Sequence, residues 1–295
     1  MILPRMYQVK QHFTGDAAKD IPAQISRALN AANMKDILQP GQRIAVAVGS
    51  RGIANIGLIV KTVVAELKKN GVHPFIVPAM GSHGGATAAG QQEVLRSLGV
   101  SCETVGAPVV SAMEVIEAGL IDGVMPVYLD KHAAEADGIF LVNRIKPHTD
   151  FDAPIESGLV KMAAIGLGNH QGCSAIHAHG LAAMIPKAAQ VLIEKGFIKG
   201  GLAIVENNRD ETAYLECISG PSLLDREPQL LAKAKQLMAR LPFDDIDVLV
   251  VKIMGKAISG TGMDTNVIGR LKVEGLPEPD GVFIKRIVAL DLSAD

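Results

Sequence analysis

Short apolar runs rich in Val and Ile alternate along the chain with longer segments of helical periodicity. Residues 43–50 form one such run, residues 53–71 follow with helical spacing, and residues 74–80 form a second run. This order predicts a strand, a helix and a second strand, which together make one βαβ unit. Repetition of the same rhythm further along predicts an α/β fold with a mostly parallel sheet and flanking helices.

The remaining runs extend this pattern towards the carboxyl end. The further elements that we expect are helices at about 87–98, 182–196 and 222–241 and strands at 137–143, 202–207 and 247–255. The last of these segments contains an apolar run, which suits a strand covered on both faces. Turn residues with low apolar content at 274–281 predict a boundary between a large first domain, 1–273, and the beginning of a second domain, 274–295.

Composition excludes several classes of partner. The 295 residues are 48% hydrophobic and 20% charged, which is typical of an ordered globular chain. Lys and Arg number 29 against 31 Asp and Glu, without runs of like charge, so neither nucleic acid nor membrane is expected as a partner. Residues 1–13 lack the apolar stretch of a secretory signal, and a cytoplasmic location is expected. The odd number of cysteines, 3, without CxxC spacing, indicates neither disulfides nor a thiolate zinc site.

Glycine-rich or cationic turns follow four of the predicted strands, at 49–52, 81–85, 144–150 and 259–264. In open α/β sheets, ligands bind beyond the carboxyl ends of the strands. Glycine lets main-chain N–H groups approach an anion closely, so such turns suit a phosphate or a carboxylate. A single turn of this kind is often only a turn, but four together favour a ligand site at the carboxyl ends of the strands.

Histidine gives a sharper signal. Of 8 histidines, His83 and His148 fall in these turns, while His170, His177 and His179 lie within ten residues of one another. Neutral imidazole can act as a base near pH 7 or bind a transition metal. Two histidines at separate strand ends could take a proton from one face of a stereocentre and return one on the other. His177 and His179 diverge in any regular element, so at most one of them is expected to be a ligand.

Lys161 is the other candidate. It lies in an otherwise apolar, glycine-rich segment, 156–168. Burial would lower the pKa of its amine and make it an available nucleophile. A lysine at a helix end that extends its amine to solvent is an equally good interpretation, and the residues alone leave both open.

His83 in a Gly-x-His turn, then His148, Lys161 and His177, occur in an order that resembles the nickel-pincer-nucleotide racemases and epimerases typified by lactate racemase. The resemblance extends over nearly the whole chain and concerns the amino-terminal domain of that family. It implies that Lys161 carries the nickel-pincer nucleotide, a pyridinium mononucleotide, through a thioamide. It also implies that His177 binds nickel and that His83 and His148 act as acid and base.

The same resemblance implies that Arg51 and Lys272 contact the substrate, a 2-hydroxy acid, and that the cofactor-building enzymes are partners of the chain. It further implies a second domain that closes over the site, of which this chain holds only the beginning. Two positions depart from the lactate enzymes, because Val48 replaces an aspartate and Gly269 replaces a glutamine. With Arg270 beside the glycine, these changes favour a larger or more anionic substrate than lactate, such as a sugar acid.

Two alternatives remain beside a hydroxy-acid isomerase. A zinc or nickel hydrolase could be built on His170, His177 and His179, but no carboxylate-bearing motif such as HExxH accompanies them. A non-catalytic anion-binding or cofactor-binding protein is the other, since fold and function separate readily.

Overall fold

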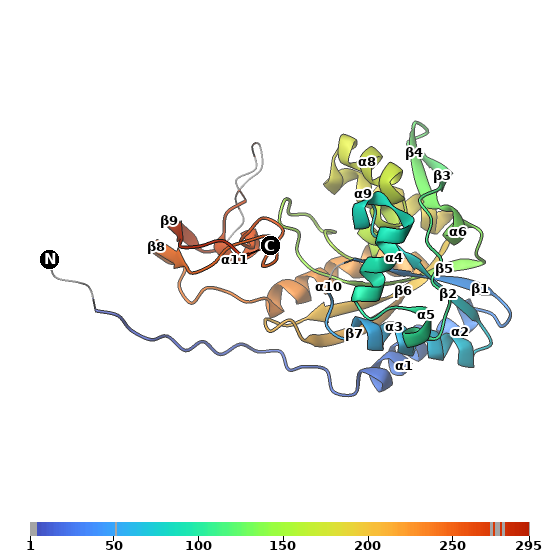
Figure 1. Ribbon diagram of the computed structural model, residues 1–295, viewed down its shortest axis with the longest axis horizontal. Helices are drawn as coiled ribbons and strands as arrows, with labels where there is room; N and C mark the ends of the chain where they lie inside the picture. The colour runs from blue at the N-terminus through green and yellow to red at the C-terminus, as the bar shows by residue number, and fades with distance from the viewer. Residues whose placement is uncertain (1–4, 51, 272–273, 275–277, 279–280, 295) are drawn as a thin grey trace.

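The computed structural model describes residues 5–50, 52–271, 274, 278 and 281–294. Its centre is a five-stranded sheet of order β2-β1-β5-β6-β7 (Figure 1). The strands are β1 (Arg43–Val48), β2 (His73–Pro78), β5 (Gly138–Arg144), β6 (Ile198–Glu206) and β7 (Thr212–Ser219). The first four run parallel, and β7 is antiparallel to β6. This confirms the predicted α/β class and the mainly parallel sheet.

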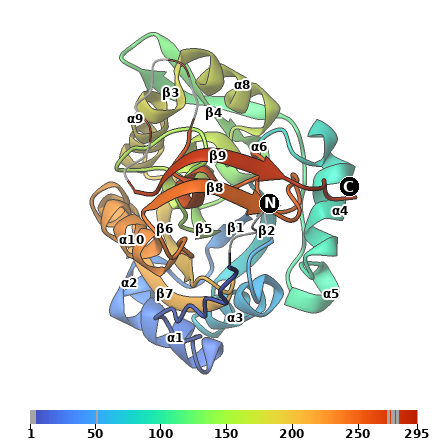
Figure 2. The ribbon, with the colours of Figure 1, turned by 90° about the vertical axis from the view of Figure 1, so that its left-hand side faces the viewer.

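Helices cover both faces of this sheet, as Figure 2 shows in a second view. The longer helices are α1 (Ile21–Ala31), α3 (Ile56–Lys69), α4 (Ala88–Ser97), α8 (Asn169–His179), α9 (Leu181–Glu194) and α10 (Leu223–Leu237). Alternate residues of β1 point into separate cores: Ile44 packs in the core that holds α1 and α3, and Ala45 in the core that holds α9 and α10. Because both faces are buried, the strand reads in sequence as an unbroken apolar run.

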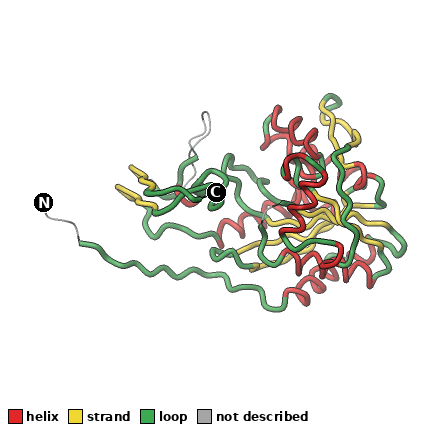
Figure 3. Tube along the Cα trace, viewed as in Figure 1, coloured by secondary structure: helices red, strands yellow, loops and turns green. Residues whose placement is uncertain are grey.

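Shorter elements complete the domain. They are α2 (Met34–Ile37), α5 (Cys102–Val105), α6 (Lys131–Ala134), α7 (Leu159–Lys161), α11 (Thr265–Ile268), the 3₁₀ turns η1 (Gly84–Ala86) and η3 (Gly220–Ser222), and the π-helical η2 (Met162–Gly166). An antiparallel hairpin of β3 (Val115–Ile121) and β4 (Met125–Asp130) packs against α8 and α9. The segment before α1 has no regular structure from residue 5 onwards and runs away from the sheet (Figure 3).

Near the carboxyl end, β8 (Asp245–Val251) and β9 (Phe283–Ala289) form a separate two-stranded parallel sheet, which fits a second domain. The strand predicted at 247–255 is present, but its expected burial on both faces is wrong, since Val250 remains 57% exposed. An apolar run shows what a strand is able to bury, not what covers it. Most of the boundary predicted at 274–281 lies outside the described residues, so the domain division stays a prediction. Among the helices of the described chain, none has the length and apolar character needed to cross a membrane.

Candidate active site

Three of the four predicted turns follow neighbouring strands, because β2, β1 and β5 are adjacent in the sheet. Their carboxyl ends therefore meet at one edge. The first two turns are joined directly, since the Ser50 hydroxyl and Nδ1 of His83 form a hydrogen bond. His83 is exposed and immediately precedes the 3₁₀ turn η1. Arg51, predicted to contact substrate from the first turn, lies outside the described residues.

Steric packing explains the glycines around His83. Gly84 has a φ of 66°, and a Cβ on Gly90 would lie 1.9 Å from the Gly84 carbonyl oxygen. Gln91, fully buried on α4, donates from Nε2 to the Gly81 carbonyl at 2.9 Å. The turn is thus packed tightly onto the start of α4, and packing alone requires Gly84 and Gly90, whether or not an anion binds there.

This packing predicts that alanine substitution destabilises the chain more at one glycine of this segment than at another. Gly90→Ala should lower the free energy of unfolding by about 1–3 kcal/mol, because a side chain there overpacks the turn. Gly85→Ala meets no atom within 4 Å, so we expect only the backbone cost of a positive φ, about 1 kcal/mol. Urea denaturation of both variants measures the difference, and a Gly90→Ala chain as stable as the unmodified one would contradict it.

His148 lies in the loop that follows β5. Its side chain is 14% exposed, and its ring stacks on Phe151 with centroids 4.5 Å apart. The Asp150 N–H donates to Nδ1 of His148 at 3.1 Å, so the neutral ring carries its proton on Nε2. The buried Glu156 carboxylate accepts the backbone N–H of His148. These contacts fix both the ring and the main chain of the candidate base.

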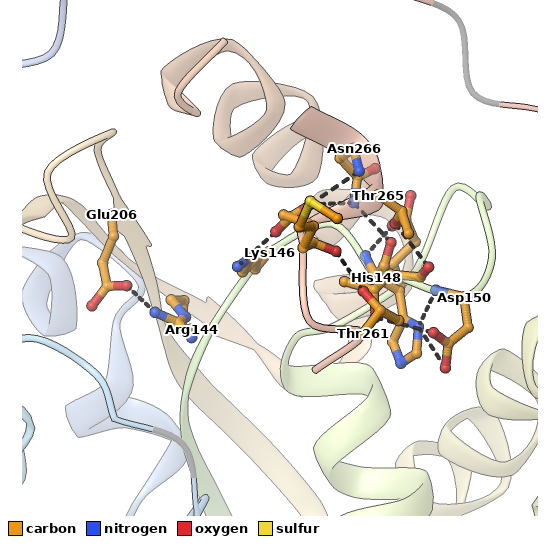
Figure 4. Close-up of polar contacts among 12 residues, drawn as sticks. Arg144, Lys146, His148, Asp150, Glu206, Thr261, Thr265 and Asn266 are labelled. Carbon is orange, nitrogen blue, oxygen red and sulfur yellow. Dashed lines mark hydrogen bonds and ion pairs between the residues drawn. The ribbon is translucent and has the colours of Figure 1, made fainter. Parts of the chain in front are cut away.

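The fourth predicted turn, 259–264, follows β8 of the small sheet and not a strand of the central sheet. The expectation that all four turns lie at one sheet edge is therefore wrong, although the segment that follows the fourth turn contacts the His148 loop. Asn266 donates from Nδ2 to the His148 carbonyl at 2.9 Å, and the Thr265 hydroxyl donates to the Thr149 carbonyl at 2.8 Å (Figure 4). Nζ of Lys146 lies 3.2 Å from Oδ2 of Asp264. The carboxyl-terminal segment therefore holds the His148 loop from outside.

Lys161 is placed where α7 continues into the π-helical turn η2. Its side chain is half-buried, whereas residues 162–169 are all buried. A Cβ on Gly49 would lie 3.2 Å from Met162 Cε and 3.3 Å from Asn143 Oδ1, so the turn after β1 contacts the segment that carries the lysine. Single π-helical turns are frequent at functional sites. The reactivity predicted for the amine itself stays a prediction.

Glu227, on α10, is a residue near the candidate site that the sequence patterns did not predict. It is 1% exposed, and its Oε2 accepts the N–H of Val160 at 3.0 Å. A Cβ on Gly158 would lie 2.3 Å from Oε1, so glycine is required for this close approach. Burial raises the pKa of Glu227 to about 7. A signal in the sequence could have identified this residue. It is an acid on the apolar face of a helix, where its neighbours at helical spacing, Leu223, Leu230 and Leu231, are all buried.

The raised pKa of Glu227 predicts a pH-dependent stability. Between its ordinary value of 4.5 and about 7, the folded chain binds this proton more tightly than the unfolded chain. The stabilisation of the folded chain by this bound proton is therefore complete below about pH 4.5 and is lost as the pH rises towards 7. Relative to Glu227→Gln, which cannot ionise, the free energy of unfolding should fall by roughly 3 kcal/mol over this range. Urea denaturation of both chains from pH 4 to 8 tests this, and parallel profiles would contradict it.

His177 lies on α8 and is exposed. It is four residues beyond Cys173, whose Sγ lies 3.9 Å from the Ser82 hydroxyl, so it lies one turn further along the helix face that contacts the His83 turn. His170 and His179 are on the same helix, and Nδ1 of His179 bonds to the Ala175 carbonyl at 2.9 Å. In the described part of the chain, no three His, Cys, Asp or Glu side chains are grouped to hold a metal. The hydrolase alternative therefore has no cluster to support it.

A buried pair fixes the beginning of α8. Asn169, fully buried with a φ of 50°, donates from Nδ2 to Oδ2 of Asp130 at 2.9 Å. Oδ1 of Asp130 accepts the Ala133 N–H at 3.0 Å, and its own N–H donates to the Leu167 carbonyl at 2.6 Å. Burial raises the pKa of this carboxyl. The helix that carries His177 is thereby tied to the hairpin strand β4.

The structure changes the argument about substrate size. Gly269 has a φ of 62°, and a Cβ there would lie 2.2 Å from the Val282 carbonyl oxygen. Backbone geometry thus accounts for this glycine without any enlarged substrate space. Val48 is fully buried at the end of β1, Arg270 is half-buried, and Lys272 lies outside the described residues.

Two surface hollows lie away from these turns. One, of about 510 Å³, is bounded by α1 and β7 and is lined in part by Arg27 and Glu216. The other, of about 350 Å³, lies between residues 11–14 and the end of α10. Neither includes a predicted site residue, so the candidate site is defined by its turns and not by these hollows.

Together, the sheet order and the turns at its carboxyl edge define an α/β domain whose candidate site is built from the loops that follow its strands. A family profile described as the lactate racemase N-terminal domain matches residues 5–189. The chain belongs to this lactate racemase N-terminal domain family, which confirms the resemblance inferred from the histidines and the lysine.

Among solved structures, the lactate racemase apoprotein from Thermoanaerobacterium thermosaccharolyticum is similar in fold, with a TM-score of 0.60 and 14% sequence identity. The similarity covers 79% of this chain and 60% of that one. The chain therefore spans about 60% of the length of this relative. A search of curated proteins gives no match.

Proposed function

We propose that this chain is the catalytic domain of a racemase or epimerase of 2-hydroxy acids that uses a nickel-pincer nucleotide. One observation carries the proposal. The residues expected from the family, His83 and His148, fall on turns at the same edge of the central sheet, and the segment of Lys161 contacts the turn between them. Membership of the lactate racemase N-terminal domain family supports a racemase-type activity.

The donor chemistry of these residues fits the cofactor. Lys161 would hold it through a thioamide and His177 would donate a ring nitrogen to nickel, so a single protein imidazole is needed and not a cluster of three. The half-buried position of Lys161 among buried neighbours suits an amine that must be both reactive and shielded. When bound, the cofactor would accept hydride from the carbon that bears the hydroxyl and return it to the other face.

The chain's own residues would manage protons and orientation. His148, with its Nδ1 accepting a backbone N–H, exchanges its proton at Nε2 and would give or take the proton of the substrate hydroxyl. His83, which follows β2 and forms a hydrogen bond with Ser50 on the turn after the neighbouring strand β1, would do the same for the other enantiomer. Arg51 and Lys272 are proposed to hold the carboxylate, so that the planar 2-oxo acid stays bound while its carbonyl group turns the opposite face towards the returning hydride.

We further propose a substrate larger or more anionic than lactate, such as a sugar acid. Val48 in place of the family's aspartate removes a negative charge just before the turn that carries Arg51. A screen of loaded enzyme against 2-hydroxy acids tests this, and racemisation of lactate faster than every sugar acid would overturn it.

The function is tested on the full chain prepared alongside the cofactor-building enzymes. Intact-mass spectrometry and metal analysis are read together. Equimolar nickel with a mass increment on the peptide that contains Lys161 supports the proposal. Zinc without an adduct would favour the hydrolase, and neither metal nor adduct would favour a binding protein.

A further inference from the structure

Helix α10 sends two ionisable side chains towards the candidate site from a part of the chain beyond residues 5–189, the region matched by the family profile. Lys235, near its end, places Nζ 2.8 Å from Oε1 of Glu156. The other oxygen of Glu156 accepts the backbone N–H of His148. Helix α10 is thus joined to the candidate base through one intervening carboxylate.

This ion pair differs from an ordinary surface pair. The Glu156 side chain is 1% exposed, whereas Lys235 is 39% exposed and also pairs with Asp152 at 2.6 Å. Burial raises the pKa of Glu156, and the nearby Lys235 ammonium opposes that shift. Without Lys235, a buried carboxylate would lose its cation and its hold on the His148 loop would weaken.

The second side chain is Glu227, near the beginning of the same helix. Its Oε2 accepts the Val160 N–H, immediately before Lys161, and its Oε1 has no hydrogen-bond partner in the described part of the chain. Gly158 leaves the space that the carboxyl occupies. An acceptor so deeply buried fixes the two residues that precede Lys161.

Glu227 and Lys235 are eight residues apart, so they lie about two turns and roughly 12 Å apart along one rigid helix. Any movement of α10 would displace the His148 loop and the Lys161 segment together. Both links use charged or buried polar groups, where the energetic consequence of losing a partner is large.

We propose that α10 sets the relative position of the candidate base and the cofactor-bearing lysine, with Lys235 and Glu227 as positioning residues. Neither touches the reacting atoms. The catalytic meaning of this arrangement rests on the proposed function, whereas the anchoring itself concerns the chain without cofactor.

Amide hydrogen exchange of the full, cofactor-free chain tests the anchoring. Lys235→Met should speed exchange about tenfold in peptides covering 146–157 and leave 158–168 within twofold. Glu227→Leu should do the reverse, because it removes the acceptor for backbone N–H groups at the start of α7. Lys235→Arg and Glu227→Gln, which keep a cation and an acceptor, should restore most of the protection.

Matched controls lie on the same helix. Lys233→Met loses an ammonium that sits 3.8 Å from the Tyr214 ring centroid, and Arg226→Gln loses a pair with Glu216 at 2.6 Å. Neither should change exchange in the two site segments. If Lys235→Met leaves the His148 loop at its original exchange rate, or if all these variants loosen the chain uniformly, the anchoring is wrong.

In the loaded enzyme, Lys235→Met should lower kcat about tenfold with KM within twofold, and Lys235→Arg should recover it. A merely structural role would lower the amount of active enzyme without this split and without rescue. Segment-specific exchange in a chain that never racemises a hydroxy acid supports the anchoring and counts against the proposed function. Activity with unchanged exchange and unchanged kcat supports the function and overturns the anchoring.

Discussion

Lys161→Ala should abolish both the cofactor-derived mass increment and racemase activity in the chain prepared alongside the cofactor-building enzymes. The expectation follows from the proposed thioamide, for which no other side chain of the buried segment 162–169 offers an amine. Without the tether, the hydride acceptor is lost, so turnover should fall to the uncatalysed rate. Intact mass, bound nickel and racemisation of the best 2-hydroxy acid are the three measurements.

Lys187→Ala is the matched control, because this lysine lies on α9 and pairs with Asp122 at 2.6 Å in an exposed position. It should retain increment, nickel and activity. Both variants should unfold at similar urea concentrations, which separates loss of attachment from loss of fold. Retention of the mass increment in Lys161→Ala would exclude this lysine as the point of attachment.

The central sheet was predictable because burial on both faces leaves a direct trace in the sequence. The runs that became β1 and β5 are apolar at consecutive positions, and turns with glycine or charge mark their ends. Since carboxyl ends of neighbouring parallel strands meet at one edge, the turn with His83 and the loop with His148 could be expected near each other. Their order in the chain then carried the resemblance to a family.

Elements in which apolar and polar residues are mixed were not predicted from the sequence. Strand β7 is an edge strand that mixes buried and partly exposed residues without strict alternation, and α1 is a short amphipathic helix whose start is marked by the Asp20 cap and Pro22. The opposite error occurred at β8, where an apolar run suggested burial that the described chain does not provide. Periodicity reports the preference of a segment, whereas burial depends on which other segments pack against it.

Site residues divide in the same way. Lys161 stood out because a charge in an apolar segment is unusual, but Glu227 acquires its role only through Gly158 and Val160, which are nearly seventy residues away in the chain. Gly269 shows the converse, because its absent side chain suggested substrate space and its positive φ supplies a local reason. The role of such a residue depends on partners that are distant in the chain, and no local sequence pattern identifies those partners.

His148→Ala should reduce turnover of the loaded enzyme by about 10²–10⁴, the range typical of a general acid or base. The substrate carboxylate is assigned to other residues, so KM should change far less than kcat. His179→Ala is a suitable control, since that ring bonds to a carbonyl of its own helix. Intact mass and nickel should be unchanged in both variants, which shows that attachment is intact.

The direction of the reaction sharpens this test. If substrate and product are enantiomers, the equilibrium constant is unity. The value of kcat/KM must then fall by the same factor in both directions, even when His148 moves the hydroxyl proton of only one enantiomer. A two-base arrangement then requires His83→Ala to produce a loss of comparable size, whereas a single base at His148 leaves His83→Ala near the original rate. Unchanged turnover in His148→Ala removes this histidine from the mechanism, and the two variants together decide how many imidazoles move the hydroxyl proton.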